Sequence, residues 1–414
     1  MNNETLNAQA RELEKIIVAN VSEILGAWRD CKLGDVVNLK RGYDLPHNDR
    51  AAGLFPIVSS SGITDHHAVA KVKGPGVVTG RYGTLGEVFF IENDFWPLNT
   101  SLYVQDFKGN DRRFISYFLR RLDFETQNAA GAVPGVNRNH LHAMDVRVPP
   151  LPVQQRIAGI LSAYDELIEN SQRRIRILEA MARALYREWF VHFRFPDYEK
   201  LPRVASPLGD IPKGWEVRTV ADSFEISGGG TPSRKESEYW EGGTIQWFSP
   251  SNLTGAGTMF MDDSDELITE RGLAESSARL FPARSVMLTS RATIGAIAIN
   301  THEACTNQGF ITCLPNECVP LYLLFHGLTE NVPQFVRMAS GATFKEISRG
   351  VFKTIDFVHP SPAVVRQFES QAEPMSKRIL ALQRQIQNLR RTRDLLLPRL
   401  LSGQVRAPGL HEGN

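Results

Sequence analysis

The sequence predicts an α+β protein in which two repeated mixed α/β domains are separated by two long antiparallel coiled-coil helices with pseudo-two-fold symmetry. Three observations lead to this fold class. The chain has 414 residues, of which 42% are hydrophobic and 22% charged, a composition typical of a folded protein with two or three domains. A stretch of the first half recurs about 210 residues later. Each copy is followed by a heptad pattern.

The repeat is clearest around a tight turn between two expected strands. Residues 76–104 resemble residues 285–313, and the turn 81–86 becomes 291–295, one residue shorter. Further pairs follow in the same order at offsets of 209 or 210: Asn99 with Gln308, Gly131-Ala132 with Gly341-Ala342, Pro150 with Pro360, Pro152 with Pro362 and Arg156 with Arg366. A run of ordered pairs indicates duplication of a whole domain.

The heptads predict one narrow apolar seam on each long helix, and the simplest partner for each helix is the other one. The first seam consists of Ile157, Leu161, Tyr164, Ile168, Ser171, Ile175, Leu178, Ala182, Leu185 and Trp189. The second consists of Phe368, Ala372, Met375, Ile379, Leu382, Ile386, Leu389, Arg393, Leu396 and Leu400.

The expected organisation follows the chain from an N-terminal amphipathic helix to a short tail. The predicted parts are the N-terminal helix (1–27), a first head (28–150), a central long helix (151–195), an extended proline-rich linker (196–213), a second head (214–360), a C-terminal long helix (361–403) and the tail (404–414).

This geometry suggests double-stranded DNA as the partner. The first seam spans 33 residues, or about 50 Å of helix, which corresponds to on the order of 15 base pairs. A two-fold object matches the dyad of the duplex, and because the heads differ in sequence the site should be asymmetric. Residues 377–399 carry seven Lys/Arg against one acid, and residues 171–187 carry five Arg against one acid. These charges suit either phosphates or a solvated helix face.

Several polar loop residues have side chains that can read base edges, since Arg suits guanine and Asn or Gln suits adenine. In the first head the candidates are Lys40, Arg41, Ser60, Arg81, Tyr82, Asn99, Asn137, Arg138 and Asn139. In the second they are Ser249, Asn252, Ser290, Arg291, Asn307, Gln308, Lys345 and Arg349. Arg81 and Arg291 are the strongest candidates because they occur at the same turn. For any single residue, an ordinary polar loop position is the alternative.

Catalytic motifs are largely missing. The sequence has no GxxxxGK[ST] phosphate loop, and the glycine-rich stretch 228–232 has no lysine and is interpreted as a flexible turn. His302, Cys305, Cys313 and Cys318 are a possible zinc set, but the repeat gives Cys305 and Cys313 apolar core positions, so we expect no metal. The net charge of +1, the four cysteines and the lack of a signal peptide or membrane span predict a cytoplasmic protein.

Taken together, the chain resembles a specificity (S) subunit of a type I restriction–modification system. The resemblance covers nearly the whole chain and rests on the turns 83–86 and 293–295, the Pro-Leu-Pro-x-x-Gln-Arg start of the first helix at 150–156, the helix end at 174–196 and Leu-Leu-Leu-Pro-Arg-Leu-Leu-Ser-Gly at 395–403. The second helix departs from the pattern, because residues 360–366 lack the Leu and Gln-Gln of the first.

The resemblance implies two target-recognition domains that each read half of a bipartite DNA site. It also implies that the helices dock two modification (M) subunits, which supply S-adenosylmethionine and methylate adenine N6. Restriction (R) subunits, if present, would bring ATP and Mg²⁺ chemistry, and this chain itself would hold no cofactor. Two alternatives remain: a two-headed interaction scaffold that does not touch DNA, and an unrecognised hydrolase in one head.

Overall fold

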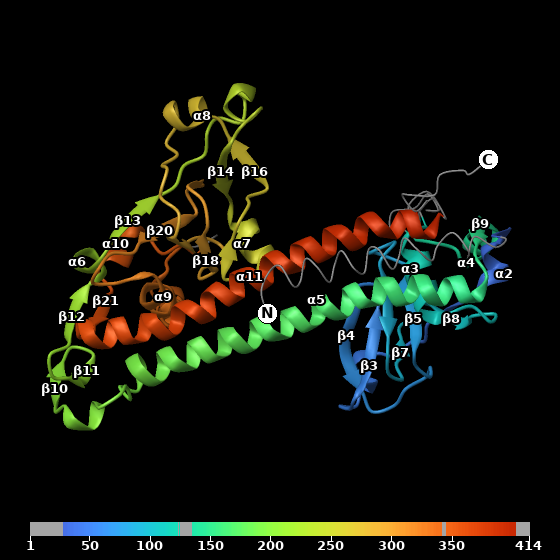
Figure 1. Cartoon of the computed structure of the whole chain (residues 1–414), viewed down its shortest axis with the longest axis horizontal. Helices are drawn as coiled ribbons and strands as arrows, with labels where there is room; N and C mark the ends of the chain where they lie inside the picture. Colours follow the sequence, from blue (N-terminus) through green and yellow to red (C-terminus); the bar gives the residue numbers. More distant parts are fainter. Residues whose placement is uncertain (1–27, 123, 125–134, 342–344, 403–414) are drawn as a thin grey trace, which may run out of the picture. The chain divides into compact units, whose positions relative to one another are not determined.

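The computed structural model describes residues 28–122, 124, 135–341 and 345–402. The predicted N-terminal helix and tail therefore lie outside the described residues, as do Gly131, Ala132 and Ala342. The chain divides into two compact units: unit 1 combines the residues up to Glu169 with those from Gln387 onward, and unit 2 is Asn170–Ile386. Each unit holds one head and one part of each long helix (Figure 1).

The described residues of the head of unit 1 form three small sheets and three short helices. Strand β1 (Arg29–Lys32) pairs with β9 (Asp145–Val148). The four-stranded sheet has the order β2 (Asn38–Arg41), β8 (Ser101–Asp106), β5 (Gly76–Gly80), β6 (Val88–Ile91). The three-stranded sheet has the order β4 (Gly62–His67), β3 (Phe55–Ser59), β7 (Trp96–Pro97). The helices are α2 (Leu33–Val36), α3 (Arg112–Arg120) and α4 (Arg138–Ala143), with a 3₁₀ turn η1 (His47–Asp49).

The head of unit 2 repeats this plan with additions. Strand β12 (Glu216–Thr219) pairs with β21 (Asp356–His359). The main sheet has the order β13 (Glu225–Gly228), β20 (Phe310–Leu314), β17 (Val286–Thr289), β18 (Ile297–Asn300), β15 (Phe260–Met261). The small sheet has the order β16 (Glu266–Ile268), β14 (Ile245–Phe248), β19 (Ala304–Thr306). The helices are α6 (Val220–Ser223), α7 (Pro250–Ala256), α8 (Glu270–Ala274), α9 (Leu321–Met338) and α10 (Arg349–Lys353), with a 3₁₀ turn η4 (Ser237–Tyr239).

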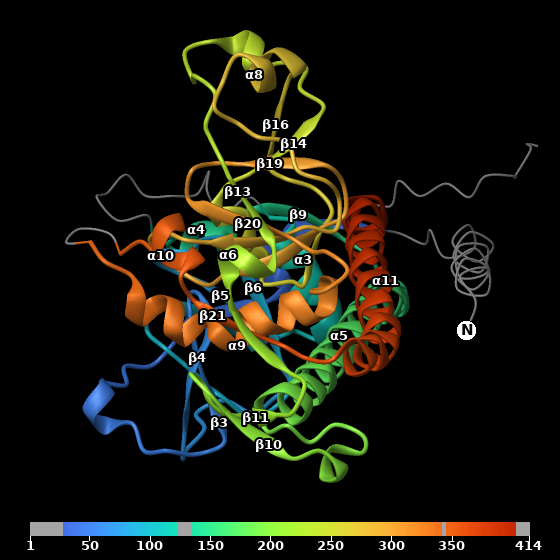
Figure 2. The same ribbon diagram turned by 90° about the vertical axis from the view of Figure 1, so that its left-hand side faces the viewer.

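Strand pairing confirms the duplication. In the small sheet of unit 1, β3 runs antiparallel to β4 and parallel to β7. In unit 2, β14 has the same relation to β16 and β19. The small sheet of unit 2 forms, together with α8 and η4, an outer lobe that stands out from the rest of its unit in both views (Figure 2). Its own small core contains Trp247, Ile268 and Cys305.

The backbone corrects the alignment at the tight turn. Val78 pairs with Tyr103 and Met287 pairs with Thr312, which fixes an offset of 209 through the strands before the turn. Gly80 N–H donates to Glu87 and Thr289 N–H donates to Ala296, so the same offset continues beyond it. The two turns therefore have equal length. Arg291 is therefore equivalent to Tyr82 in the alignment of the two heads, and Ser290 is equivalent to Arg81.

Residues with a left-handed backbone conformation lie at equivalent positions of the two turns in this register. Gly83 has φ of 82° and Ala292, 209 residues later, has φ of 60°. A second shift appears at the end of the heads, where β9 and β21, each paired with the first strand of its head, are related by an offset of 211. The sequence alignment was wrong by one residue at both places because it matched identical side chains rather than ladder positions.

The predicted linker is not simply extended. It contains a 3₁₀ turn η3 (Tyr198–Lys200) and a hairpin of β10 (Arg203–Ser206) and β11 (Gly209–Pro212). Phe195 stacks on Trp215 with ring centroids 5.1 Å apart, and Ile211 is buried in the same core. Phe195, just before the linker, and Ile211 within it thus anchor this segment to the head of unit 2.

The two long helices are α5 (Leu151–Tyr186), which continues into a π-helical turn η2 (Arg187–Val191), and α11 (Pro362–Leu401). Every predicted seam residue is buried or half-buried. In unit 1, Leu161 shares a core with Leu400 and, one turn further along α5, Asp165 contacts Arg393. As the residue number increases along α5, the number of the contacting residue on α11 decreases. The helices are therefore antiparallel, as the sequence predicts (Figure 1).

Candidate nucleic-acid interface

Five segments of the first head meet at one edge of its sheets. The turn after β5 is bound to the segment after β7, because Arg81 N–H and Tyr82 N–H both donate to Thr100 O. It is also bound to the start of α4, since Val136 N–H donates to Arg81 O at 3.0 Å. The end of β3 joins the same edge through Leu98 N–H, which donates to Val58 O.

Predicted residues occupy this edge and are held by neighbouring side chains. Asp44 accepts hydrogen bonds from both Arg41 and Asn99, and therefore links the end of β2 to the segment after β7. The Arg81 guanidinium lies over the Tyr82 ring at 4.6 Å from the centroid, and Lys40 lies 5.7 Å from the centre of Tyr43. Three predicted residues lie at the start of α4 and are exposed: Asn137, Arg138 and Asn139.

The second head brings the equivalent segments together. The backbones of Arg291 and Glu346 form an isolated antiparallel β-bridge, and Ile347 N–H donates to Ser290 O. The turn therefore again lies against the start of the last short helix. Asn307 N–H donates to Phe248 O, as Leu98 does to Val58 in the first head. At the end of each middle strand, two serine hydroxyls bond to each other: Ser59 with Ser61 at 2.9 Å, and Ser249 with Ser251 at 2.7 Å.

The glycine-rich stretch 228–232 is packed rather than flexible, contrary to the interpretation from sequence. A Cβ atom on Gly228 would lie 2.4 Å from Nη1 of Arg349, and one on Gly229 would lie 2.0 Å from the carbonyl of Asn307. Thr231 then donates to Gln308 Oε1 at 2.7 Å. This segment therefore ties three predicted residues into one edge, which requires residues without side chains at the crossings.

Not every predicted residue is available on the surface. Ser290 is only 2% exposed. Asn252 is 8% exposed, accepts from Ser249 N–H at 2.7 Å and donates to Asp265 at 2.6 Å, so its side chain holds the start of α7. Asn307 uses its amide oxygen to accept Gly309 N–H. The exposed members of the set in this head are Arg291, Gln308, Lys345 and Arg349.

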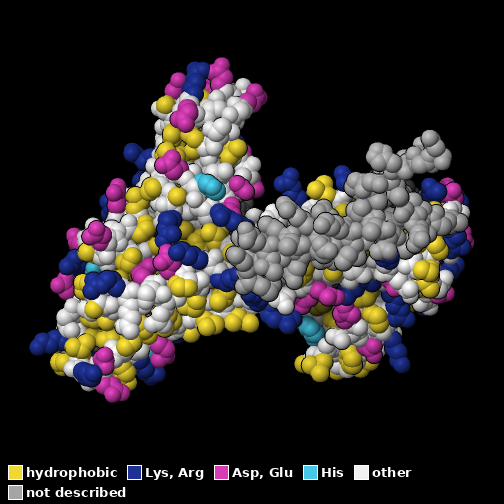
Figure 3. Space-filling view, in the orientation of Figure 1, with side chains coloured by type: hydrophobic (Ala, Val, Ile, Leu, Met, Phe, Trp, Pro, Cys, Tyr) yellow, Lys and Arg dark blue, Asp and Glu magenta, His cyan; other side chains and the backbone are white. Residues whose placement is uncertain are grey.

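Much of the positive charge on the long helices serves internal ion pairs. In unit 2, Arg384 binds Asp262 at 2.7 Å and Arg183 binds Glu330 at 2.8 Å. In unit 1, Arg393 binds Asp165 at 2.6 Å, with side chains 23% and 28% exposed. On the face shown in Figure 3, basic and acidic side chains are interspersed rather than separated into one basic field.

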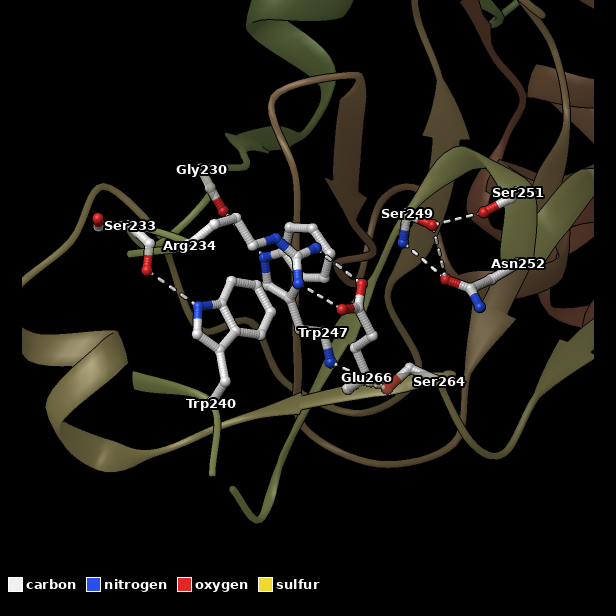
Figure 4. Close-up of polar contacts among 10 residues, drawn as sticks. All are labelled: Gly230, Ser233, Arg234, Trp240, Trp247, Ser249, Ser251, Asn252, Ser264 and Glu266. Carbon is white, nitrogen blue, oxygen red and sulfur yellow. Dashed lines mark hydrogen bonds and ion pairs between the residues drawn. The ribbon is translucent and has the colours of Figure 1, made fainter. Parts of the chain in front are cut away.

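The sequence interpretation missed one arginine of the outer lobe. Arg234 lies beside two adjoining indoles, with its guanidinium carbon 3.7 Å from the centre of Trp240 and 5.1 Å from that of Trp247 (Figure 4). Both of its terminal nitrogens bind the carboxylate of Glu266, Nη2 at 2.8 Å. That hydrogen bond to Arg234 holds the pKa of Glu266 below its usual range. The available signal was an arginine followed by two tryptophans within 13 residues.

The possible zinc residues do not assemble in the part of the chain that the structure describes. Cys305 and Cys313 are fully buried in the core, and burial raises the pKa of the Cys305 thiol to about 12. His302 and Cys318 are exposed. Among described residues there is no group of three His, Cys, Asp or Glu side chains that could hold a metal ion. None of the described helices is sufficiently long and apolar to span a bilayer.

Two heads that carry the same edge within one chain define a class of two-domain proteins. Comparison with known proteins gives the family. The type I restriction modification DNA specificity domain matches the chain twice, at residues 26–180 and 212–367. Because these matches cover well over half of the chain, the protein belongs to this family.

Individual relatives agree with the family. The chain is 37% identical over 157 residues to the type I restriction enzyme MjaIX specificity subunit of Methanocaldococcus jannaschii, which covers 37% of this chain and 36% of that protein. It is 21% identical to the HindI specificity subunit of Haemophilus influenzae over 91% of this chain and 99% of the relative. A crystal structure of a type I restriction–modification S subunit from M. genitalium has the same fold, with a TM-score of 0.61, 15% identity and coverage of 93% and 97%.

Proposed function

We propose that this chain is the non-catalytic, DNA-reading subunit of a type I restriction–modification complex and that its two heads read the two halves of one asymmetric site. The partner is double-stranded DNA, and the complex works in the cytoplasm. The support comes from the family and from the repeated edge of the two heads. Arg, Asn and Gln side chains on such an edge suit the donor and acceptor patterns of bases in the major groove.

The observation that carries the proposal is a constant backbone with different side chains. At equivalent places the first head has Arg41, Tyr82 and Asn99, and the second has Gly228, Arg291 and Gln308. A frame that holds different side chains in the same place would present different hydrogen-bond patterns to DNA. Two unlike half-sites, and therefore an asymmetric motif, follow from this difference.

The long helices are the proposed docking surface for two modification (M) subunits. Ile177 and Met181 lie one turn apart on α5, and each is 53% exposed although the seam of the same helix is covered. The M subunits would bind S-adenosylmethionine and methylate adenine N6 after extruding the base from the duplex. Restriction (R) subunits, where the system has them, would attach through M and use ATP and Mg²⁺. This chain would position the DNA for both.

The test of the proposal is replacement of residues 28–150 by the corresponding head of another family member, followed by genome-wide mapping of N6-methyladenine. We expect one gapped motif that depends on this gene, and the exchange should change one half of it and preserve the other. Changes in both halves would contradict independent heads. A methylome that does not depend on this gene, although the protein is expressed, would instead favour the two-headed scaffold without DNA readout.

Docking of M is tested by changing Ile177 and Met181 together to Asp and measuring how much M protein copurifies with the full chain. We expect at least a tenfold loss, because two charges would be buried against an apolar partner. The matched control is Leu280→Asp, an exposed apolar residue of the second head (43% exposed) that the proposal keeps away from M. Equal loss in both variants would contradict this docking face.

A further inference from the structure

The two tryptophan rings beside Arg234 are held in place by hydrogen bonds that do not involve Arg234. Trp240 donates its indole N–H to Ser233 O at 3.1 Å, and Trp247 donates to Gly230 O at 3.0 Å. Both rings are therefore attached to the backbone of the segment that carries Arg234. The guanidinium carbon lies 3.7 Å from the centre of the Trp240 ring, and the end of the guanidinium is held by Glu266 (Figure 4). An arginine held this way loses little conformational entropy when it binds a ligand.

The guanidinium retains donors for a ligand. It has five N–H groups, and the contact with Glu266 uses one on each terminal nitrogen. Within the described parts of the chain, Nε has no hydrogen-bond partner, and the Arg234 side chain is 52% exposed. The edge formed by Nε and the neighbouring Nη therefore faces away from Glu266 with two parallel donors. That pattern matches two adjacent acceptors, as guanine presents with O6 and N7.

The segment 228–234 connects Arg234 along the backbone to the edge that contains the other exposed residues of this head. Gly228 lies against Arg349, Thr231 donates to Gln308, and Arg234 follows three residues later. Packing of the glycines keeps this segment rigid, so Arg234 and Gln308 have a fixed relation. Arg234 is thus three residues away from a contact with that edge and is not an isolated surface ion pair.

The first head provides an internal comparison. Asp65 occupies the strand position equivalent to Glu266, because Asp65 pairs with Ile57 and Glu266 pairs with Trp247. Asp65 binds Arg50 at 3.3 Å, and the Arg50 side chain is only 20% exposed. The shared element is thus an arginine–carboxylate pair, and in the second head the arginine lies against two adjoining indoles and is more exposed to solvent.

From these observations we propose that Arg234 is a specificity-determining residue of the second head that reads one guanine of its half-site through a bidentate contact, with Trp240 and Glu266 as positioning residues. This inference rests on the proposed function and deepens it. Because Glu266 neutralises the arginine, the contact should contribute to base choice far more than to general phosphate attraction.

The experiment maps the methylated motif in cells that express the full chain as wild type, Arg234→Ala or Arg234→Lys. We expect the alanine variant to lose about tenfold to a hundredfold of the preference for G·C at one position of the second head's half-site. The other half-site should be unchanged. Lysine should not restore the preference, because an ammonium lacks the planar fork. The matched control is Arg271→Ala, an arginine of the same lobe that binds Glu238 and Glu275 and, among the described residues, does not lie over an indole ring.

Each outcome is decisive for one of the two proposals. An unchanged motif in Arg234→Ala, full restoration by lysine, or equal weakening of both half-sites would overturn the reading role of Arg234. If the alanine variant is not expressed stably, Arg234→Lys alone decides, since it keeps the alkyl chain and charge and must still lose the preference. Absence of any gene-dependent gapped motif with the wild-type chain would instead contradict the proposed function itself.

Discussion

The two heads are joined to the long helices by junctions with the same architecture but different chemistry. In unit 1, Gln154 of α5 accepts Asp111 N–H at the start of α3, and its amide nitrogen donates to Asn110 and to Pro149 O. In unit 2, Glu369 of α11 accepts Leu323 N–H at the start of α9. Each long helix thus caps a helix of its head, once with a neutral amide and once with a carboxyl group.

The carboxyl group makes the second junction sensitive to pH. Burial raises the pKa of Glu369 to about 7, although backbone hydrogen bonds from Leu323 and Tyr322 oppose the shift. His326, on α9 and in ring contact with Phe368, has its pKa lowered to about 4, chiefly by burial. A duplicated fold can therefore keep its geometry while its two copies acquire different responses to solution conditions.

The largest expected effect comes from the apolar part of the second junction. Phe368 is 0% exposed and contacts the rings of Tyr186, Trp189 and Phe190. Phe368→Ala should lower the free energy of unfolding of unit 2 by about 3–5 kcal/mol, because the cavity cannot close among rigid rings. Hydrogen exchange resolved by peptides measures this, since it reports each unit separately.

The matched variant is Ile157→Ala at the equivalent seam position of unit 1, where Ile157 is 5% exposed. Here we expect about 2–4 kcal/mol, confined to peptides of unit 1. Loss of protection spread evenly over both units in either variant would show that the junctions do not unfold independently.

The repeat, the seams and the two-headed organisation could be predicted because they depend on periodic patterns. One polar seam position also has a structural explanation. Arg393 interrupts the second heptad, and in the structure it pairs with Asp165 of the facing helix. The one-residue error at the turn arose because Arg81 and Arg291 look alike, whereas ladder hydrogen bonds determine the register. Identity of side chains carries no information about which ladder position they occupy.

The candidate site was predicted less completely than the fold, because residues that contact each other in the site are far apart along the chain. Arg234 and Glu266 are 32 residues apart and lie on different elements, so no local pattern joins them. Packing of Gly229 against Asn307 likewise depends on a contact between distant segments. The burial of Ser290 and Asn252 follows from tertiary neighbours that a single sequence does not specify.

A smaller effect is expected from the charged seam pair. Asp165 accepts hydrogen bonds from Arg393 and from the hydroxyl of Tyr117, so it joins both long helices to α3. Asp165→Ala should cost unit 1 about 2–3 kcal/mol, less than a fully buried pair because both side chains are about one quarter exposed. The comparison is Asp262→Ala in unit 2, whose partner Arg384 is 50% exposed and can turn to solvent. There we expect about 1 kcal/mol. Equal costs by hydrogen exchange would refute this ranking.

The smallest effect tests the pH difference between the junctions. The folded-state pKa of Glu369 lies above its ordinary value of 4.5, so the folded state holds this proton more tightly than the unfolded state. Stability from this group is therefore complete below pH 4.5 and is lost as the pH rises to about 7. Glu369→Gln keeps the acceptor for Leu323 N–H and removes the titration. Unit 2 of the variant should gain roughly 1–2 kcal/mol relative to wild type between pH 4.5 and 7.

The converse variant makes the test symmetrical. Gln154→Glu would direct a carboxylate at Pro149 O and at the side-chain oxygen of Asn110, which now accept hydrogen bonds from the amide. Unit 1 should then acquire the loss of stability with rising pH that wild-type unit 2 shows, because one oxygen of the buried carboxylate would face two acceptors while the other keeps the hydrogen bond from Asp111 N–H. Hydrogen exchange followed between pH 4.5 and 7 checks both variants. If the pH profile of unit 2 is the same with glutamate and glutamine at 369, the titrating group of this junction is not Glu369.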